Sequence, residues 1–293
     1  MRMSSAEISR RAAEPGAPAH PLTMTAREFA TVAILAREEF GLELGAGKEQ
    51  LVAARIGKVA RKLGFRAFRD YYEYVMGDGS GEALVQLIDA LTTNHTSFFR
   101  EQAHFDFLAR EILPAQRERN PMWIWSAGCS TGEEPYSIAL AAREALGGDG
   151  GVLPRILATD ISTRVLDTAR LGVYSAERFQ GGPAPWLRKY LLRGEGKWEG
   201  HYRMRPEVLE MVVLGRLNLI EPLPEIGPFA VIFCRNVMIY FSRATQQQLV
   251  SSLASRLEPG GYLFVGHSEG LTGIRHDLQQ IQPAIYRRRG ERR

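Results

Sequence analysis

The sequence has little cysteine and no long hydrophobic run. Only two of its 293 residues are cysteine, Cys129 and Cys234, and each ends an apolar stretch. This excludes a disulfide framework and fits two free thiols in a reducing compartment, so we expect a cytoplasmic protein. The chain lacks the roughly 18 consecutive apolar residues of a transmembrane helix, and residues 1–24 lack the apolar core of a signal peptide. We therefore expect neither membrane insertion nor secretion.

The charge is modest in sum and uneven in distribution. The net charge is +4, but residues 48–69 hold seven basic residues and one acidic residue, and residues 286–293 hold five and one. The rest of the chain is therefore net acidic. A basic patch on an acidic protein predicts an acidic partner, which could be nucleic acid, anionic lipid or an acidic protein surface.

The first part of the chain has the apolar spacing of helices. Thr25 with Glu28 forms a sequence typical of a capping box, and Gly41 supplies a stop. We expect a disordered tail over residues 1–24, followed by a helical domain and its linker over residues 25–115.

The apolar pattern changes after Pro121. Short apolar runs that alternate with helical stretches predict buried strands at residues 122–127, 155–159, 210–214, 230–234 and 262–265. Such alternation indicates an α/β domain with a mostly parallel sheet covered on both faces. We expect this domain over residues 116–287, an inserted β-subdomain at about residues 186–206, and a basic tail over residues 288–293.

The strongest motif is a glycine-rich turn between a strand and a helix, WSAGCSTGEEPYSIA over residues 125–139. Its Gly-x-Ser-x-Gly pattern, followed along the chain by Asp160 and His267, formally matches the nucleophile elbow of α/β-hydrolases. Against this interpretation, only helices precede the strand. Glu133 and Glu134 would also oppose the negative charge of an acyl-transfer transition state. A dinucleotide site is disfavoured because the acidic pair would repel a pyrophosphate.

A ligand without phosphate fits this turn better. Asp160 ends the second predicted strand, where its carboxylate can accept hydrogen bonds from ribose hydroxyls; the alternative is an N-cap for the helix after it. A phosphate-free glycine turn with a ribose carboxylate describes a pocket for S-adenosylmethionine. The sequence offers no convincing catalytic set of His with Asp or Cys, and we expect no metal site.

Six ordered motifs make a family resemblance specific: TTNHTSFFREQAHF, WSAGCSTGEEPYSIA, ATDIS, LNL, FCRNVMIYF and GYLFVGHSE. Together they resemble the chemotaxis receptor methyltransferase family, CheR, from about Met24 to Tyr286. The resemblance implies a protein-glutamate O-methyltransferase that uses S-adenosylmethionine and releases S-adenosylhomocysteine. It also implies a small all-helical domain before a doubly wound, Rossmann-like methyltransferase domain with an inserted β-subdomain.

The resemblance also implies particular site residues. The family's cofactor contacts fall on Asn94, Thr96, Arg100, Glu134, Asp160, Asn218, Leu219, Arg235 and Asn236. A glutamate acceptor is ionised at neutral pH, so the enzyme needs no general base and acts by holding the reacting groups in line. We expect Arg100 to orient the cofactor or the acceptor carboxylate, and Tyr240 to line the transfer site.

The same resemblance implies a partner for the basic segment over residues 48–69. Arg55, Lys58, Arg61 and Lys62 lie on one face of a predicted helix and could dock on glutamate-rich receptor helices. The β-subdomain, around residues 194–205, could bind a receptor's C-terminal peptide. We expect a monomer and no nucleic-acid partner. Two alternatives stay open: a methyltransferase for another protein or for RNA, and a cofactor-binding signalling module with weak catalysis.

Overall fold

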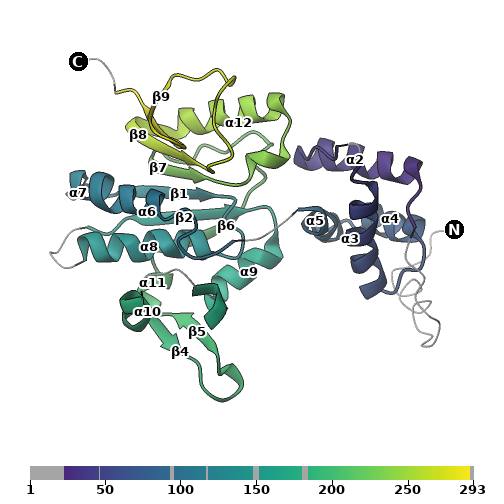
Figure 1. The fold of residues 1–293 in the computed structure, drawn as a ribbon, viewed down its shortest axis with the longest axis horizontal. Helices are drawn as coiled ribbons and strands as arrows, with labels where there is room; N and C mark the ends of the chain where they lie inside the picture. Colours follow the sequence, from purple (N-terminus) through teal and green to yellow (C-terminus); the bar gives the residue numbers. More distant parts are fainter. Residues whose placement is uncertain are drawn as a thin grey trace. The chain divides into compact units, whose positions relative to one another are not determined.

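The computed structural model describes residues 23–45, 47–92, 96–116, 118–147, 152–179 and 184–290. The chain forms two compact units, residues 1–94 and residues 95–293 (Figure 1). Most of the expected disordered tail and the last three residues of the basic tail lie outside the described residues. Within the described ranges, no helix has both the length and the apolar character needed to cross a membrane.

The first unit is all-helical, as expected. Its helices are α2 (Ala26–Phe40), α3 (Glu49–Lys62), α4 (Phe68–Gly77) and α5 (Glu82–Leu91). The predicted capping box is confirmed, because Thr25 Oγ1 accepts from the Glu28 amide and Glu28 accepts from the Thr25 amide. One apolar face of each helix is buried, for example at Val32, Ala36 and Ile56. These faces form the core of the unit.

The second unit contains a seven-stranded sheet in the order β6-β2-β1-β7-β8-β10-β9. The strands are β1 (Trp123–Ala127), β2 (Arg155–Asp160), β6 (Val212–Arg216), β7 (Phe229–Cys234), β8 (Leu257–Val265), β9 (Leu278–Gln282) and β10 (Ile285–Arg288). The five predicted strands are present and pair parallel with one another in the order β6-β2-β1-β7-β8. The terminal hairpin β9–β10, which we did not predict, adds an antiparallel edge.

Helices flank the sheet on both sides (Figure 1). The elements before β2 are α6 (Ala103–Phe107), the π-helical turn η1 (Leu108–Ile112), α7 (Leu113–Ala115) and α8 (Glu133–Leu146). Those after it are α9 (Thr163–Leu171), η2 (Ala176–Phe179), α10 (Ala184–Tyr190), η3 (Gly196–Trp198), α11 (Pro206–Leu209), η4 (Met238–Tyr240) and α12 (Arg243–Arg256).

The two faces of the sheet bury different side chains. Ile124, Val231 and Phe233 belong to the core shared with α6 and α8, whereas Trp125 and Ile232 belong to the core shared with α12. Successive residues of a strand point to opposite faces, and parallel strands buried on both faces read as continuous apolar runs. The doubly wound α/β fold expected from the sequence is therefore confirmed.

Residues 96–115, which we assigned to the helical domain and linker, pack in the second unit instead. Phe98, Phe105, Leu108 and Ile112 are buried in the core that includes residues of α8 and β1. Helical periodicity identifies these residues as helix but does not say which core they enter. The segment therefore forms part of the sheet domain.

The inserted subdomain is a three-stranded antiparallel sheet in the order β3-β5-β4. Its strands are β3 (Val173–Ser175), β4 (Leu191–Arg193) and β5 (His201–Met204). The sheet begins earlier than the expected range of 186–206, because β3 follows directly after α9 and pairs with β5. A three-residue strand is too short to show an alternating pattern in the sequence.

Candidate functional site

The site lies where the order of the sheet reverses. From β1 the chain proceeds to β2 and β6 on one side, and later to β7 and β8 on the other. The carboxyl ends of β1 and β7 are therefore adjacent, with helices leading away on opposite faces. Such a switch point is the usual ligand position in an open α/β sheet.

The glycine turn after β1 depends on two glycines. Gly128 and Gly132 have φ of 83° and 97°, in the left-handed region. A Cβ at Gly132 would lie 2.7 Å from the Tyr174 hydroxyl and 2.8 Å from Ala169 Cβ. Between the glycines, Ser130 also has a positive φ, 49°. The turn therefore packs closely on α9 and β3.

Asp160, at the end of β2, fixes the conformation of this turn. Its Oδ2 accepts from the Ser130 amide at 2.8 Å, and its Oδ1 accepts from the Ser162 amide at 3.0 Å. The N-cap residue of α9 is Ser162 rather than Asp160. The N-cap alternative for Asp160 is thus wrong, and its carboxylate belongs to the edge of the site.

A buried ion pair joins the turn to β7. Arg235, directly after β7, has a side chain only 2% exposed and places Nη1 3.0 Å from Glu134 Oε2. The other oxygen of Glu134 accepts from the Ser126 hydroxyl of β1 at 2.7 Å. Burial raises the pKa of Glu134, although Arg235 and Ser126 act in the opposite direction. Two side chains 101 positions apart in the sequence are thereby held together.

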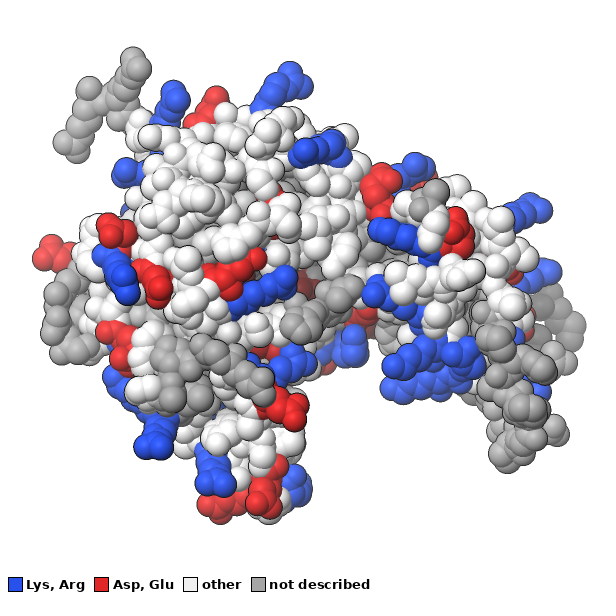
Figure 2. All heavy atoms as spheres, in the orientation of Figure 1, with Lys and Arg blue, Asp and Glu red and all other residues white. Residues whose placement is uncertain are grey.

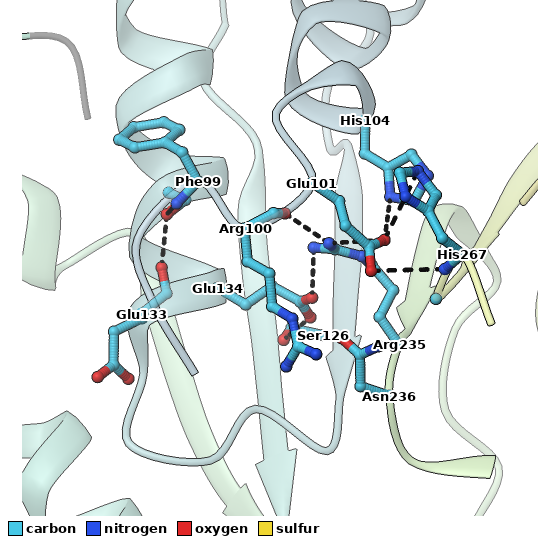
Figure 3. Close-up of polar contacts among 12 residues, drawn as sticks. Phe99, Arg100, Glu101, His104, Ser126, Glu133, Glu134, Arg235, Asn236 and His267 are labelled. Carbon is cyan, nitrogen blue, oxygen red and sulfur yellow. Dashed lines mark hydrogen bonds and ion pairs between the residues drawn. The ribbon is translucent and has the colours of Figure 1, made fainter. Parts of the chain in front are cut away.

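The guanidinium of Arg235 also binds the segment before α6 (Figure 3). Nη2 lies 3.1 Å from Glu101 Oε2 and donates to the backbone oxygen of Arg100. The ring of Phe105 lies 5.6 Å from the guanidinium carbon. Burial acts to raise the pKa of Glu101, but Arg235 and His267 outweigh it and lower the pKa. Arg235 is thus held between two carboxylates.

The neighbouring carboxylate, Glu133, faces a different partner. It is fully buried, its Oε1 lies 2.9 Å from Arg178 Nη1 of η2, and its Oε2 accepts from the Thr131 hydroxyl. The same Arg178 nitrogen donates to the backbone oxygen of Thr96 at 3.3 Å. Glu133 therefore ties the glycine turn to the start of the inserted subdomain.

A third buried carboxylate shapes the loop after β7. Glu269 Oε2 accepts from the amides of Asn236 and Gly266 at 2.5 and 2.7 Å, and Oε1 accepts from the Ile239 amide at 3.1 Å. Asn236 has a φ of 60°, in the left-handed region, which asparagine adopts more readily than most residues with a side chain. Glu269 thus holds the loop that carries Arg235 and Asn236 in one conformation.

The sequence motifs did not assign roles to the supporting groups. These are Glu101, Ser126, Glu133, Arg178 and Glu269. Four of them lie within the quoted motifs, but a single sequence does not say which motif residue contacts ligand and which holds its neighbours. Arg178 lies outside every motif, and no signal in the sequence marks it.

The remaining predicted pocket residues lie around the same edge of the sheet. Arg100 is half-buried before α6, and Tyr240 ends η4 in the loop after β7. Asn218 donates to Glu221 in the segment after β6, and Leu219 is buried. Asn94 lies outside the described residues.

The residues predicted for docking lie in α3 of the first unit. Lys58, Arg61 and Lys62 are exposed, and blue side chains gather on this unit in Figure 2. Arg55 differs, because it is half-buried and donates to the backbone oxygen of Leu91 at 2.7 Å. Arg55 therefore joins α3 to the end of α5.

The geometry does not assemble the hydrolase triad. His267 contacts Glu101 and His104, while Asp160 accepts from backbone amides. A nucleophile elbow would instead need Ser130, the imidazole and the carboxylate in one hydrogen-bonded chain.

Comparison with known proteins gives the same division of the chain. Residues 27–92 match the family model described as "CheR methyltransferase, all-alpha domain", and residues 94–286 match "CheR methyltransferase, SAM binding domain". Chemotaxis protein methyltransferase 2 of Pseudomonas aeruginosa is 40% identical over 84% of this chain and 87% of its own length.

Two further relatives cover still more of the chain. The chemotaxis protein methyltransferase of Borreliella burgdorferi is 36% identical over 91% of this chain and 96% of its own length. That of Escherichia coli is 38% identical over 90% of this chain and 92% of its own length. With both units matched in order, the chain belongs to the CheR family of S-adenosylmethionine-dependent methyltransferases.

Proposed function

We propose that this protein transfers the methyl group of S-adenosylmethionine to glutamate side chains of chemoreceptors, forming glutamate methyl esters in sensory adaptation. The observation that carries the proposal is the match of both units to the CheR models. A cytoplasmic monomer that binds no nucleic acid is the form we propose for it.

The chemistry of the site fits S-adenosylmethionine. Glu134 and Asp160 put two carboxylates at the glycine turn, which suits amino and hydroxyl groups better than phosphate. Asp160 accepts from the Ser130 and Ser162 amides, which places its carboxylate beside the glycine turn, where it can also face ribose hydroxyls. The buried Ser130 hydroxyl has no hydrogen-bond partner within the described part of the chain, so a ligand could satisfy it.

When bound, S-adenosylmethionine supplies a methyl group on a sulfonium. We assign its binding to the residues named from the resemblance: Asn94, Thr96, Arg100, Glu134, Asp160, Asn218, Leu219, Arg235 and Asn236. The role of these side chains is to fix the cofactor and exclude water, because the acceptor carboxylate is already ionised. Arg100 and Tyr240 are the residues to which we assign contact with the reacting groups.

The test is a methyl-transfer assay with labelled cofactor and receptor-bearing membranes. We expect label that alkali releases as methanol. Arg100→Ala and Tyr240→Phe should each lower kcat by about tenfold or more, since misplaced reacting groups lose much of the advantage of proximity. The matched control is Arg170→Ala, because Arg170 pairs with Asp167 at the surface of α9. Base-stable label would point to another acceptor, and cofactor binding without transfer would point to a signalling module.

Two surfaces are proposed for receptor docking. Lys58, Arg61 and Lys62 present positive charge to glutamate-rich helices. On the inserted sheet, β4 is an edge strand, and Leu192 and Trp198 near it are 41% and 49% exposed. An extended receptor C-terminus could add to such an edge as a further strand. Titration with receptor C-terminal peptides tests this; binding unchanged by Trp198→Ala would count against it.

A further inference from the structure

Beside the ion pairs of Arg235 lies a cluster that the proposed methyl transfer does not use. Glu101 lies just before α6, His104 lies in the first turn of α6, and His267 follows β8. His104 Nδ1 and His267 Nε2 lie 3.5 and 3.9 Å from the same Glu101 oxygen (Figure 3). One ligand atom from each side chain lies within 4.8 Å of the other two. Two distant segments therefore bring three metal-ligating side chains together.

His104 lacks the partners expected of a buried imidazole. It is 1% exposed, and neither ring nitrogen makes a hydrogen bond within the described residues, although Nδ1 lies 3.5 Å from Glu101 Oε2. Buried polar groups are almost always satisfied, and a neutral imidazole is the form that binds metals. His104 can therefore offer one ring nitrogen to a ligand.

The spacing of the three groups suits a small divalent metal ion. Zinc binds imidazole nitrogen and carboxylate oxygen at about 2.0–2.2 Å in a tetrahedral arrangement, which separates ligand atoms by about 3.4 Å. The distances of 3.5 and 3.9 Å to Glu101 are close to this value, and all three ligand atoms lie within 4.8 Å of one another, so side-chain rotations can bring them to it. The side chain of His267 is 56% exposed, which leaves a path to solvent and room for a water ligand.

We propose that Glu101, His104 and His267 form a binding site for a divalent transition metal, with zinc as the representative ion. The site is separate from the residues assigned to the cofactor but touches them through Glu101, which Arg235 also contacts. A metal ion draws negative charge from Glu101 and weakens its attraction for Arg235. Metal binding and cofactor binding should therefore oppose each other, reciprocally.

The test is equilibrium dialysis of the full chain against zinc, with bound metal counted by mass spectrometry. We expect one zinc ion per chain, and at least tenfold weaker binding in His267→Ala. His267 is exposed, so this variant should fold, which circular dichroism checks. The matched control is His201→Ala, which removes a histidine of β5 whose Nδ1 lies near the backbone oxygen of Glu199. The second variant is His104→Phe, which removes the imidazole nitrogens but keeps a ring among the aromatic neighbours of His104.

Cobalt provides a spectroscopic readout independent of methyl transfer. Cobalt(II) in a tetrahedral site of nitrogen and oxygen ligands should give visible absorption bands that disappear in His267→Ala and persist in His201→Ala. Saturating zinc should also weaken S-adenosylhomocysteine binding in the native chain but not in His267→Ala. The absence of saturable zinc binding, or equal loss in the two histidine variants, would overturn the proposal whether or not methyl transfer is observed.

Discussion

Each unit contains an ion pair of similar length, but the two pairs differ in their exposure to solvent. In the helical unit, the pair Arg69–Glu73 spans 2.9 Å with side chains 81% and 62% exposed. In the sheet unit, Arg235 and Glu134 are at nearly the same distance, 3.0 Å, with side chains 2% and 13% exposed. Exposed pairs contribute little because water and salt screen them, whereas the loss of one partner leaves a buried charge uncompensated. Two pairs at nearly the same distance therefore contribute differently: Arg69–Glu73 lies at the surface, whereas Arg235–Glu134 is buried and holds residues of the candidate site together.

The largest expected effect comes from Arg235→Ala, which leaves Glu134 and Glu101 without their shared cation. Breaking a buried ion pair should lower the free energy of unfolding by about 3–5 kcal/mol and abolish detectable cofactor binding. Urea denaturation and calorimetry with S-adenosylhomocysteine measure the two effects. Arg69→Ala is the matched control, with little change expected in either. Similar losses in both variants would remove the contrast between the units.

The next effect concerns Glu269, a buried carboxylate that accepts from backbone amides. Glu269→Gln keeps one acceptor but turns an NH₂ group toward backbone amides, which should cost about 1–3 kcal/mol of unfolding free energy. The loop after β7 should shift, so cofactor affinity should fall while KM for receptor stays unchanged. The control is Glu258→Gln, because Glu258 is equally buried but pairs with Arg119. Unchanged cofactor affinity in Glu269→Gln would exclude the positioning role.

Arg178→Ala tests a second ion pair of the sheet unit, the one between Arg178 and Glu133. It removes the cation from the fully buried Glu133, and the free energy of unfolding should fall by about 1–3 kcal/mol. Adding Glu133→Gln should restore part of that loss, because the remaining group is no longer charged. Thermal unfolding of the single and double variants measures this. No recovery in the double variant would mean that the ion pair is not the cause.

The smallest effect on stability is expected for the exposed basic side chains of α3. Lys58→Glu with Arg61→Glu changes exposed side chains of α3, so the unfolding midpoint should stay the same. KM for receptor should rise several-fold, and the rise should shrink at high salt. Cofactor affinity, measured in parallel, should not change. A KM equal to that of the native chain would show that this face does not dock the receptor.

The sequence predicts the fold better than the site. The five parallel strands are apolar runs, and the capping box at Thr25 is a local signal; both are confirmed. The placement of residues 96–115 depends on which core they enter, which is a long-range property. The strand β3 has three residues and carries no pattern of its own.

Family motifs name the predicted pocket residues but do not say which side chains hold them in place. Glu133 and Glu134 are identical and adjacent in sequence, yet one binds Arg178 and the other Arg235. The choice follows from which side of α8 each residue faces, and local sequence does not contain the partner. The contacts of Glu101 and Glu269 are likewise long-range. Only the folded chain shows which motif residues support others.

The pair of Glu133 and Arg178 has a consequence for protein engineering. The inserted subdomain is one continuous segment between α9 and β6. Since we propose that its sheet binds a receptor C-terminus, exchanging this segment with that of a relative is a way to test receptor choice. Arg178 precedes β4, so a graft that begins at β4 keeps the cation, whereas a graft that begins at β3 replaces it. A successful chimera should therefore keep Arg178 with the recipient, or import a donor segment that supplies an arginine at the same place.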